Sequence, residues 1–318
     1  MNVRVTGANG FVGRCLVQRL HDCGHDVRGG CGAEGPAASP GSGRGEGRGH
    51  LEWVRLDVTD RTSVTAFLEG PCDAVIHLAG IASVRAANAK PAAAWAVNAG
   101  GTALVAEALA GARGRAGSDP LLLVASSAEV YSRGADRPYR ETDPVGPTTA
   151  YAASKLGAEL AALQTWRCTG LRVVVARPFP HIGPGQSAEF WVARRARVLL
   201  EAKRLGAPAV TVGDLTPVRD FLHVEDVVDA YIGLLTKGRP GETYNVASGQ
   251  GVTLETVHAK LEALIGVHPV RERDAGEVRP DARPHLVGDA AKLRAATGWA
   301  PRRSLDDTLR EVVDAQAD

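Results

Sequence analysis

Three side chains have the types and the spacing needed to exchange a proton with an alcohol or ketone oxygen. Tyr151 and Lys155 stand four residues apart in a segment that favours a helix, so they share one face of it. A tyrosine has a pKa of about 10, and a neighbouring ammonium would stabilise its phenolate form. Ser127 follows an apolar stretch and could hydrogen-bond the same oxygen. The Tyr–Lys spacing alone is also typical of a solvated helix face, but the serine and the features below favour acid–base chemistry.

The first residues predict the element that would hold a cofactor beside these groups. A β-branched run, Val3–Val5, passes into Gly7, Gly10 and Gly13, and a helical apolar pattern starts at Phe11. Glycine suits a tight strand-to-helix turn and a close approach to a pyrophosphate, whose charge meets the helix N-terminus. The alternative is a plain glycine turn. We predict that a dinucleotide contacts Gly7, Asn9, Gly10, Phe11, Val12 and Gly13.

The end of the second strand bears on the choice between NAD and NADP. The sequence predicts this strand at His25–Arg28, followed by a glycine-rich run instead of the carboxylate that usually binds the NAD ribose. The nearest acid is Glu34. Arg28 is therefore a candidate partner for a 2′-phosphate, which favours NADP(H). Arg44 and Arg48 either share this role or are incidental to a flexible surface loop, which the composition predicts for residues 29–50.

Alternating strands and helices predict the fold class. Further strands are expected at 51–58, 74–80, 121–125 and 172–177, with helical segments between them. This order predicts an α/β fold with a doubly wound parallel sheet (Rossmann), which binds ligands at the carboxyl ends of its strands. We predict a dinucleotide-binding domain over 1–178. Residues 179–318 would form mainly a smaller, mixed α/β substrate lobe, with segments near 222–248 returning to the sheet.

Composition narrows the possible partners. The chain has 318 residues, and its 37 Lys and Arg nearly balance its 36 Asp and Glu, so we expect no nucleic-acid partner. Five scattered cysteines without metal-ligand spacing predict a reducing, cytoplasmic location and no metal site. Neither a signal peptide nor an apolar run long enough to cross a bilayer is expected.

Several motifs together identify a family. They are TGANGFVG at the start, LDVTD at 56–60, HLAG at 77–80, NAGGT at 98–102, SSAEVY at 126–131 and YAASK at 151–155. With them the chain resembles the extended short-chain dehydrogenase/reductase family, the nucleotide-sugar epimerases, dehydratases and reductases. The resemblance implies that Ser127, Tyr151 and Lys155 are catalytic, that Lys155 also holds the nicotinamide ribose, and that Asp57 lies near the adenine. It adds to the cofactor site Val58, Leu78, Ala79, Gly80, Asn98 and Pro178.

The second half is most similar to the GDP-4-keto-6-deoxy-mannose reductases and the related GDP-mannose dehydratases. The similarity runs through RPFPHIGPGQ at 177–186, VRDFLHVEDVV at 218–228, YNVASG at 244–249 and the stretch 279–299. It implies that Arg219 and Arg279 bind the nucleotide diphosphate, a role that suits guanidinium groups; the alternative is surface salt bridges. The implied substrate contacts are Ser127, Ala128, Glu129, His181, Arg219 and Arg279.

Two departures from the family pattern shape the functional prediction. Pro180 replaces an asparagine that touches the substrate phosphate in relatives. Ala128 cannot protonate a leaving group as the matching residue of several dehydratases does, although Glu129, the matching base, is present. We therefore predict a homodimeric NAD(P)-dependent 4-ketoreductase of a nucleotide-diphosphate sugar. A 4-epimerase that retains NAD is the main alternative, ahead of a 4,6-dehydratase or a non-catalytic redox-sensing binding protein.

Overall fold

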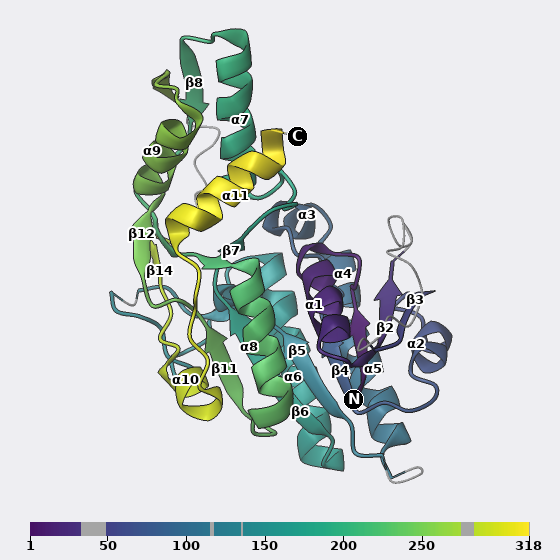
Figure 1. The fold of residues 1–318 in the computed structure, drawn as a ribbon. Helices are drawn as coiled ribbons and strands as arrows, with labels where there is room; N and C mark the ends of the chain where they lie inside the picture. Colours follow the sequence, from purple (N-terminus) through teal and green to yellow (C-terminus); the bar gives the residue numbers. More distant parts are fainter. Residues whose placement is uncertain (33–48, 115–117, 135, 275–282, 318) are drawn as a thin grey trace.

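A seven-stranded, fully parallel sheet forms the centre of the molecule (Figure 1). The computed structural model describes residues 1–32, 49–114, 118–134, 136–274 and 283–317. The strand order β11-β6-β5-β4-β1-β2-β3 reverses direction at β1, as in a doubly wound sheet. The predicted fold class is therefore confirmed. The strands are β1 (Asn2–Thr6), β2 (Asp26–Cys31), β3 (Leu51–Arg55), β4 (Ala74–His77), β5 (Leu121–Ala125), β6 (Arg172–Pro178) and β11 (Thr243–Val246).

Helices cover both faces of this sheet, which explains why its strands are apolar without alternation. In β5, Leu121 and Leu123 face the core shared with α1 (Phe11–Asp22) and α8 (Val224–Lys237). Leu122 and Val124 face the opposite core, which is formed with α2 (Arg61–Phe67), α5 (Gly101–Ala112) and α6 (Ala150–Thr169). Alternate residues of one strand thus fill two separate cores.

Local signals fix where the helices begin and end. The Thr149 hydroxyl accepts a hydrogen bond from the Ala152 N–H at the start of α6, and Gly170 ends this helix in the left-handed region at φ 73°. The carboxylate of Asp60 caps α2 in the same way. The first turns of α6, which carry Tyr151 and Lys155, lie beside the carboxyl end of β5, because the Lys155 side chain contacts Ala125 there.

A second lobe is built on three helices, α7 (Trp191–Leu205), α9 (Leu254–Ile265) and α11 (Leu305–Ala317), which share a core of their own. Small strands complete it. β7 (His181–Ile182) pairs with β10 (Leu222–His223), β8 (Ala209–Val212) with β13 (Val270–Arg273), and β9 (Val218–Asp220) lies between β12 (Gly251–Thr253) and β14 (His285–Leu286). In Figure 1 this lobe rises above the carboxyl ends of the parallel strands.

The chain enters this lobe three times. After α7 and β8–β10 it returns to the sheet as α8 and as the edge strand β11, which pairs with β6. It then supplies α9, β13 and β14 to the lobe, places α10 (Ala291–Thr297) against α8 and β11, and ends in α11. Asp220 joins these passages, because its buried carboxylate accepts hydrogen bonds from the backbone of Ser248, Gly249 and Gly288.

Candidate active site

The glycine turn after β1 has the backbone geometry of a phosphate cradle. Gly7 has a φ of 66°, and a Cβ there would lie 2.8 Å from the backbone nitrogen of Ala79. A Cβ on Gly13 would lie 2.2 Å from the Gly7 oxygen, so α1 can approach the turn only with glycine at this position. No described side chain caps α1 at Gly10, which leaves the first N–H groups of the helix for a ligand.

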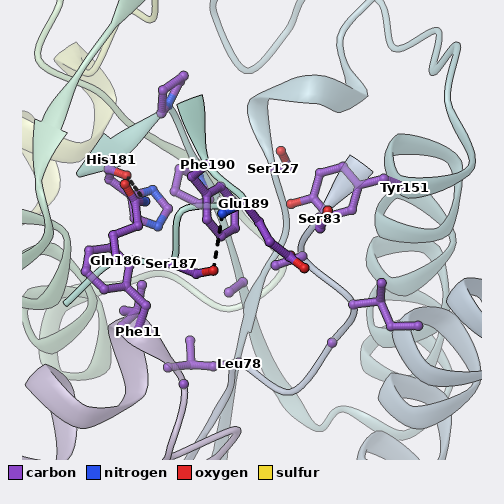
Figure 2. A pocket seen from close by; sticks show the side chains of 18 of the residues that line it. Phe11, Leu78, Ser83, Ser127, Tyr151, His181, Gln186, Ser187, Glu189 and Phe190 are labelled. Atoms are coloured by element: carbon purple, nitrogen blue, oxygen red, sulfur yellow. Dashed lines mark hydrogen bonds between the residues drawn. The ribbon is translucent and has the colours of Figure 1, made fainter. Parts of the chain in front are cut away.

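A cavity of about 1080 Å³ extends from this turn to the second lobe. It passes the carboxyl ends of β3, β4 and β5, where Figure 2 shows Phe11 and Leu78 near the turn and Tyr151 further along. The structure thus brings most of the predicted cofactor residues to one surface. Those that line the cavity are Gly7, Asn9, Gly10, Phe11, Val12, Gly13, Asp57, Val58, Leu78, Ala79, Gly80, Tyr151, Lys155 and Pro178.

Ser127, Tyr151 and Lys155 converge where the sheet meets the lobe. Ser127 follows β5, and its hydroxyl accepts a hydrogen bond from the Glu129 N–H at 3.2 Å. The Tyr151 hydroxyl hydrogen-bonds Ser127, and Figure 2 shows the two side chains facing each other. The Lys155 Nζ donates to the carbonyl oxygen of Ala125 at 2.8 Å. All three line the cavity.

The electrostatics of this trio differ from the sequence expectation. Burial raises the pKa of Tyr151 to about 12, although the hydrogen bond with Ser127 opposes the shift. Burial also lowers the pKa of Lys155 to about 8. The expectation that Lys155 would stabilise the phenolate is wrong for this arrangement, because its ammonium bonds Ala125 and desolvation dominates. The arrangement therefore favours a neutral tyrosine, which is a proton donor.

A buried ion pair between Arg177 and Glu159 lies at the end of β5, next to Ser127. Arg177 in β6 donates two hydrogen bonds to the Glu159 carboxylate, at 2.8 and 2.7 Å, and the two side chains are 7% and 3% exposed. Ser126 donates to the same carboxylate at 2.5 Å. The Arg177 guanidinium also lies 4.8 Å from the ring centre of Tyr131. These contacts fix the end of β5, which carries Ser127.

The prediction for Arg28 is wrong. β2 continues through Gly29 and Gly30 to Cys31, because these glycines fit beneath Trp53 and Leu56, where a Cβ would clash. Arg28 therefore lies inside the strand, and its guanidinium pairs with Glu52 at 2.6 Å instead of lining the cavity. Glu34, Arg44 and Arg48 lie outside the described residues.

The sequence reasoning missed a different arginine. Arg55 ends β3 opposite Cys31, and it lines the cavity beside Gly32 and Asp57. The predicted strand continued to residue 58 and offered Asp57 at its end, whereas β3 ends at Arg55. The Asp57 carboxylate accepts hydrogen bonds from the backbone and hydroxyl of Thr59, which together lower its pKa.

Asn98 is near the cofactor site but does not line the cavity. It lies in the π-helical turn η1 (Trp95–Gly100), and its side-chain oxygen accepts from the Ile81 N–H at 2.8 Å. Its amide nitrogen donates to the Ile81 carbonyl and to the Ser154 hydroxyl. Asn98 therefore holds the loop after β4 against α6 and would act on a cofactor only through that loop.

The lobe side of the cavity carries basic and polar groups. His181 stacks on Phe11 with ring centres 6.2 Å apart, and Figure 2 shows both with Gln186 on the wall opposite Tyr151. Arg219 lines the cavity while one of its nitrogens donates to the Val218 and Arg283 carbonyls. The sequence reasoning missed Arg194 of α7, whose buried Nε has no hydrogen-bond partner among the described residues. Arg279 lies outside the described part of the chain.

Ala128 and Glu129 also line the cavity, in the short 3₁₀ turn η3 (Ala128–Val130). Behind them lies Arg283, a buried residue that the sequence did not single out, and it forms an ion pair with Glu129 at 3.2 Å. Across the described residues, no cluster of three or more His, Cys, Asp or Glu side chains is arranged to hold a metal ion. Nor does any helix there have the length and apolarity to cross a membrane.

The glycine cradle, the long cavity and the Ser–Tyr–Lys trio define an NAD(P)-dependent enzyme with a Rossmann fold. Comparison with known sequences agrees, since the profile of the NAD dependent epimerase/dehydratase family matches residues 3–247. The chain belongs to that family.

Individual relatives include a reductase, 4-epimerases and 4,6-dehydratases. The chain is 39% identical to GDP-6-deoxy-D-mannose reductase of Pseudomonas aeruginosa, over 97% of this chain and 95% of the relative. It is 29% identical to UDP-glucose 4-epimerase of Mycolicibacterium smegmatis, over 99% and 98%. Among solved structures, RMD from Pseudomonas aeruginosa complexed with NADPH superposes with a TM-score of 0.83 at 34% identity, over 99% of this chain and 98% of that one. MoeE5 in complex with UDP-glucose and NAD gives 0.84 at 28% identity, with the same coverage.

Proposed function

We propose that this protein is an NADPH-dependent 4-ketoreductase of a nucleotide-diphosphate sugar, of the GDP-4-keto-6-deoxy-mannose type. The observation that carries the proposal is the convergence of Ser127, Tyr151 and Lys155 on the cavity that begins at the glycine turn. Reduction of a ketone consumes a proton, and a tyrosine with a pKa of about 12 supplies one at neutral pH. The 39% identity to a GDP-6-deoxy-D-mannose reductase supports the choice of substrate.

The residues present fit a nicotinamide dinucleotide. The cradle at Gly7 and Gly13 leaves no room for a Cβ, and uncapped N–H groups of α1 face the cavity, as a pyrophosphate requires. When bound, the cofactor supplies a hydride to the carbonyl carbon. Ser127 then orients the carbonyl oxygen, and Tyr151 donates its proton to the alkoxide that develops there. Lys155 lies one helical turn from Tyr151 and lines the same cavity, where its ammonium would hold the nicotinamide ribose, as the family resemblance implies.

The preference for NADPH rests on Arg55. Arg55 and Gly32 line the cavity at the adjacent ends of β3 and β2, where a carboxylate specific for NAD would otherwise stand. The remaining acid there, Asp57, is hydrogen-bonded by Thr59. A guanidinium at this position suits a 2′-phosphate. Replacing Arg55 with alanine should weaken NADPH binding roughly 10- to 100-fold and leave NADH binding within a few-fold.

Arg28→Ala is the matched control for Arg55, because this neighbouring arginine pairs with Glu52 away from the cavity. Its ratio of NADPH to NADH dissociation constants should equal that of the wild type. Both ratios are measured by fluorescence titration of protein stripped of nucleotide. An unchanged ratio in Arg55→Ala would contradict the role assigned to Arg55.

The nucleotide diphosphate would bind on the lobe side. Arg194 and Arg219 line that wall, and the buried Nε of Arg194 has no partner among the described residues. That Arg279 also binds the nucleotide diphosphate stays a prediction from the sequence. Pro180 offers no side-chain amide, so we assign the diphosphate to guanidinium groups. A homodimer and a cytoplasmic location also stay predictions.

A 4-epimerase is the second candidate, because the same trio serves that reaction and an epimerase relative matches 99% of the chain. One experiment separates the two. Freshly purified protein is denatured and its released nucleotide is assayed, and native protein is given NADPH with GDP-4-keto-6-deoxy-D-mannose. A reductase should release little nucleotide and oxidise NADPH stoichiometrically with the ketosugar. Stoichiometric release of NAD⁺, with no NADPH oxidation, would instead establish an epimerase.

A further inference from the structure

All three nitrogens of the Arg283 guanidinium contact residues of the turn that follows the catalytic serine. Its Nη2 donates to the Glu129 carbonyl at 2.6 Å, its Nη1 donates to the Ser132 carbonyl at 3.4 Å, and its Nε lies 3.2 Å from the Glu129 carboxylate. The Arg283 side chain is 3% exposed. It comes from the segment before β14, in the second lobe, so this contact joins the lobe to the catalytic turn.

Glu129 lies between this arginine and the cavity. Its side chain is 31% exposed and lines the cavity, whereas Arg283 does not. The Glu129 carboxylate is also close enough to Tyr151 to act on it, since after burial it is the second influence that raises the pKa of the phenol. Glu129 and Tyr151 thus line the same cavity, and a buried cation is paired with the Glu129 carboxylate.

This pairing limits what Glu129 can do. A carbon atom next to a ketone loses a proton only to a base that can accept and keep it. If Glu129 took that proton, its charge would disappear, and the buried Arg283 cation would keep two carbonyl acceptors but lose its counter-charge, which is strongly unfavourable. A carboxylate in this position accepts a hydrogen bond from a substrate hydroxyl at no such cost.

We propose that Arg283 is a positioning residue that fixes Glu129 as a permanent hydrogen-bond acceptor and prevents it from removing a carbon-bound proton. The inference rests on the proposed function, because it assumes that a 4-ketosugar occupies the cavity. It explains how an acid can stand at the position of a dehydratase base in a site that reduces ketones. The fixed negative charge also disfavours a phenolate at Tyr151, in keeping with a proton donor.

The test is exchange of ring protons with deuterated solvent. Protein is incubated with NADP⁺ and GDP-4-keto-6-deoxy-D-mannose in D₂O, so that hydride transfer is blocked, and the C3 and C5 proton signals are followed by NMR. If Glu129 acts as a base, a C–H bond breaks, its electron pair forms the enolate with the ketone, and the proton goes to the carboxylate. Reversal after solvent exchange leaves deuterium on carbon.

Arg283→Gln removes the charge but keeps an amide that can donate to the two carbonyls. We expect it to exchange at least tenfold faster than the wild type, and Glu129→Gln in the same chain should abolish the gain. Arg137→Gln is the matched control, because Arg137 is an exposed loop arginine paired with Asp143; it should exchange at the wild-type rate. A folded Arg283→Gln protein that exchanges no faster than the wild type would overturn the proposal.

Arg283→Met covers the case in which the glutamine variant does not fold. It removes the cation and keeps an unbranched apolar side chain that can stay buried, so exchange should rise at least threefold, and no rise would overturn the proposal. Reduction of the same ketosugar by wild-type protein with NADPH is measured separately. Failure of that reaction refutes the proposed function, whereas normal reduction without faster exchange in the variants refutes the role of Arg283 alone.

Discussion

Removing the charge of Glu159 should destabilise the protein far more than removing the charge of a surface carboxylate that also accepts two hydrogen bonds from an arginine. Glu159 accepts two hydrogen bonds from Arg177 and one from Ser126, and the pair is almost completely buried. Glu159→Gln would leave the Arg177 cation buried and unpaired. Such a loss costs about 3–5 kcal/mol in other proteins. For a chain of this size we expect a fall in Tm of roughly 4–8 °C.

The control is Glu107→Gln on the surface. Glu107 accepts two hydrogen bonds of 2.9 Å from Arg61, so its geometry matches that of Glu159, but these side chains are 59% and 65% exposed. Water can replace the lost partner there, and we expect no change in Tm outside experimental error. Both variants are compared with the wild type by scanning calorimetry at pH 7. If Glu159→Gln lowers the Tm by less than about 2 °C, or if the two variants change it equally, burial does not govern the strength of this pair.

Three further predictions concern the site. Tyr151→Phe should remove most reductase activity while NADPH binding stays within a few-fold of wild type, because only the proton-donating oxygen is lost; near-normal turnover would exclude Tyr151 as the donor. Arg194→Ala should raise the dissociation constant for GDP by roughly 10- to 100-fold, as expected for a lost charge-assisted hydrogen bond, and calorimetric titration showing equal affinity would exclude it from the diphosphate site. The pKa of Lys155 is about 8, so its ammonium is present below that pH and lost above it. We therefore expect NADPH binding to weaken several-fold between pH 7 and 9.5. A constant affinity over this range would contradict a cationic role for Lys155.

The sequence predicted the structure best at positions where the backbone conformation allows only one residue type. The turn at Gly7 and Gly13 could be predicted because no other residue fits a left-handed φ or an approach of 2.2 Å to a carbonyl. Their spacing of four residues was enough to predict that Tyr151 and Lys155 share one face of a helix. The apolar strands predicted the sheet because both of its faces are covered.

Other residues could not be placed because their environment depends on distant segments. The glycines after Arg28 were interpreted as a loop, yet they belong to β2, because large side chains of other elements fill the space that a Cβ would need. Arg283 pairs with Glu129, 154 positions away in the chain, and no local pattern marks such a pair. The same holds for the pKa of Tyr151, which depends on how deeply the helix is buried.

The late return of the chain to the sheet has a consequence for how the protein is made. β6 is buried along most of its length, and β11, its partner on one side, ends only at Val246. During synthesis, β6 therefore presents an apolar, unpaired edge until some seventy further residues have been added, including α7 and α8. An edge of this kind readily pairs with another chain. We expect nascent or truncated chains that stop near residue 178 to aggregate. Chains that extend beyond β11 can instead pair this strand with β6 and cover the exposed edge.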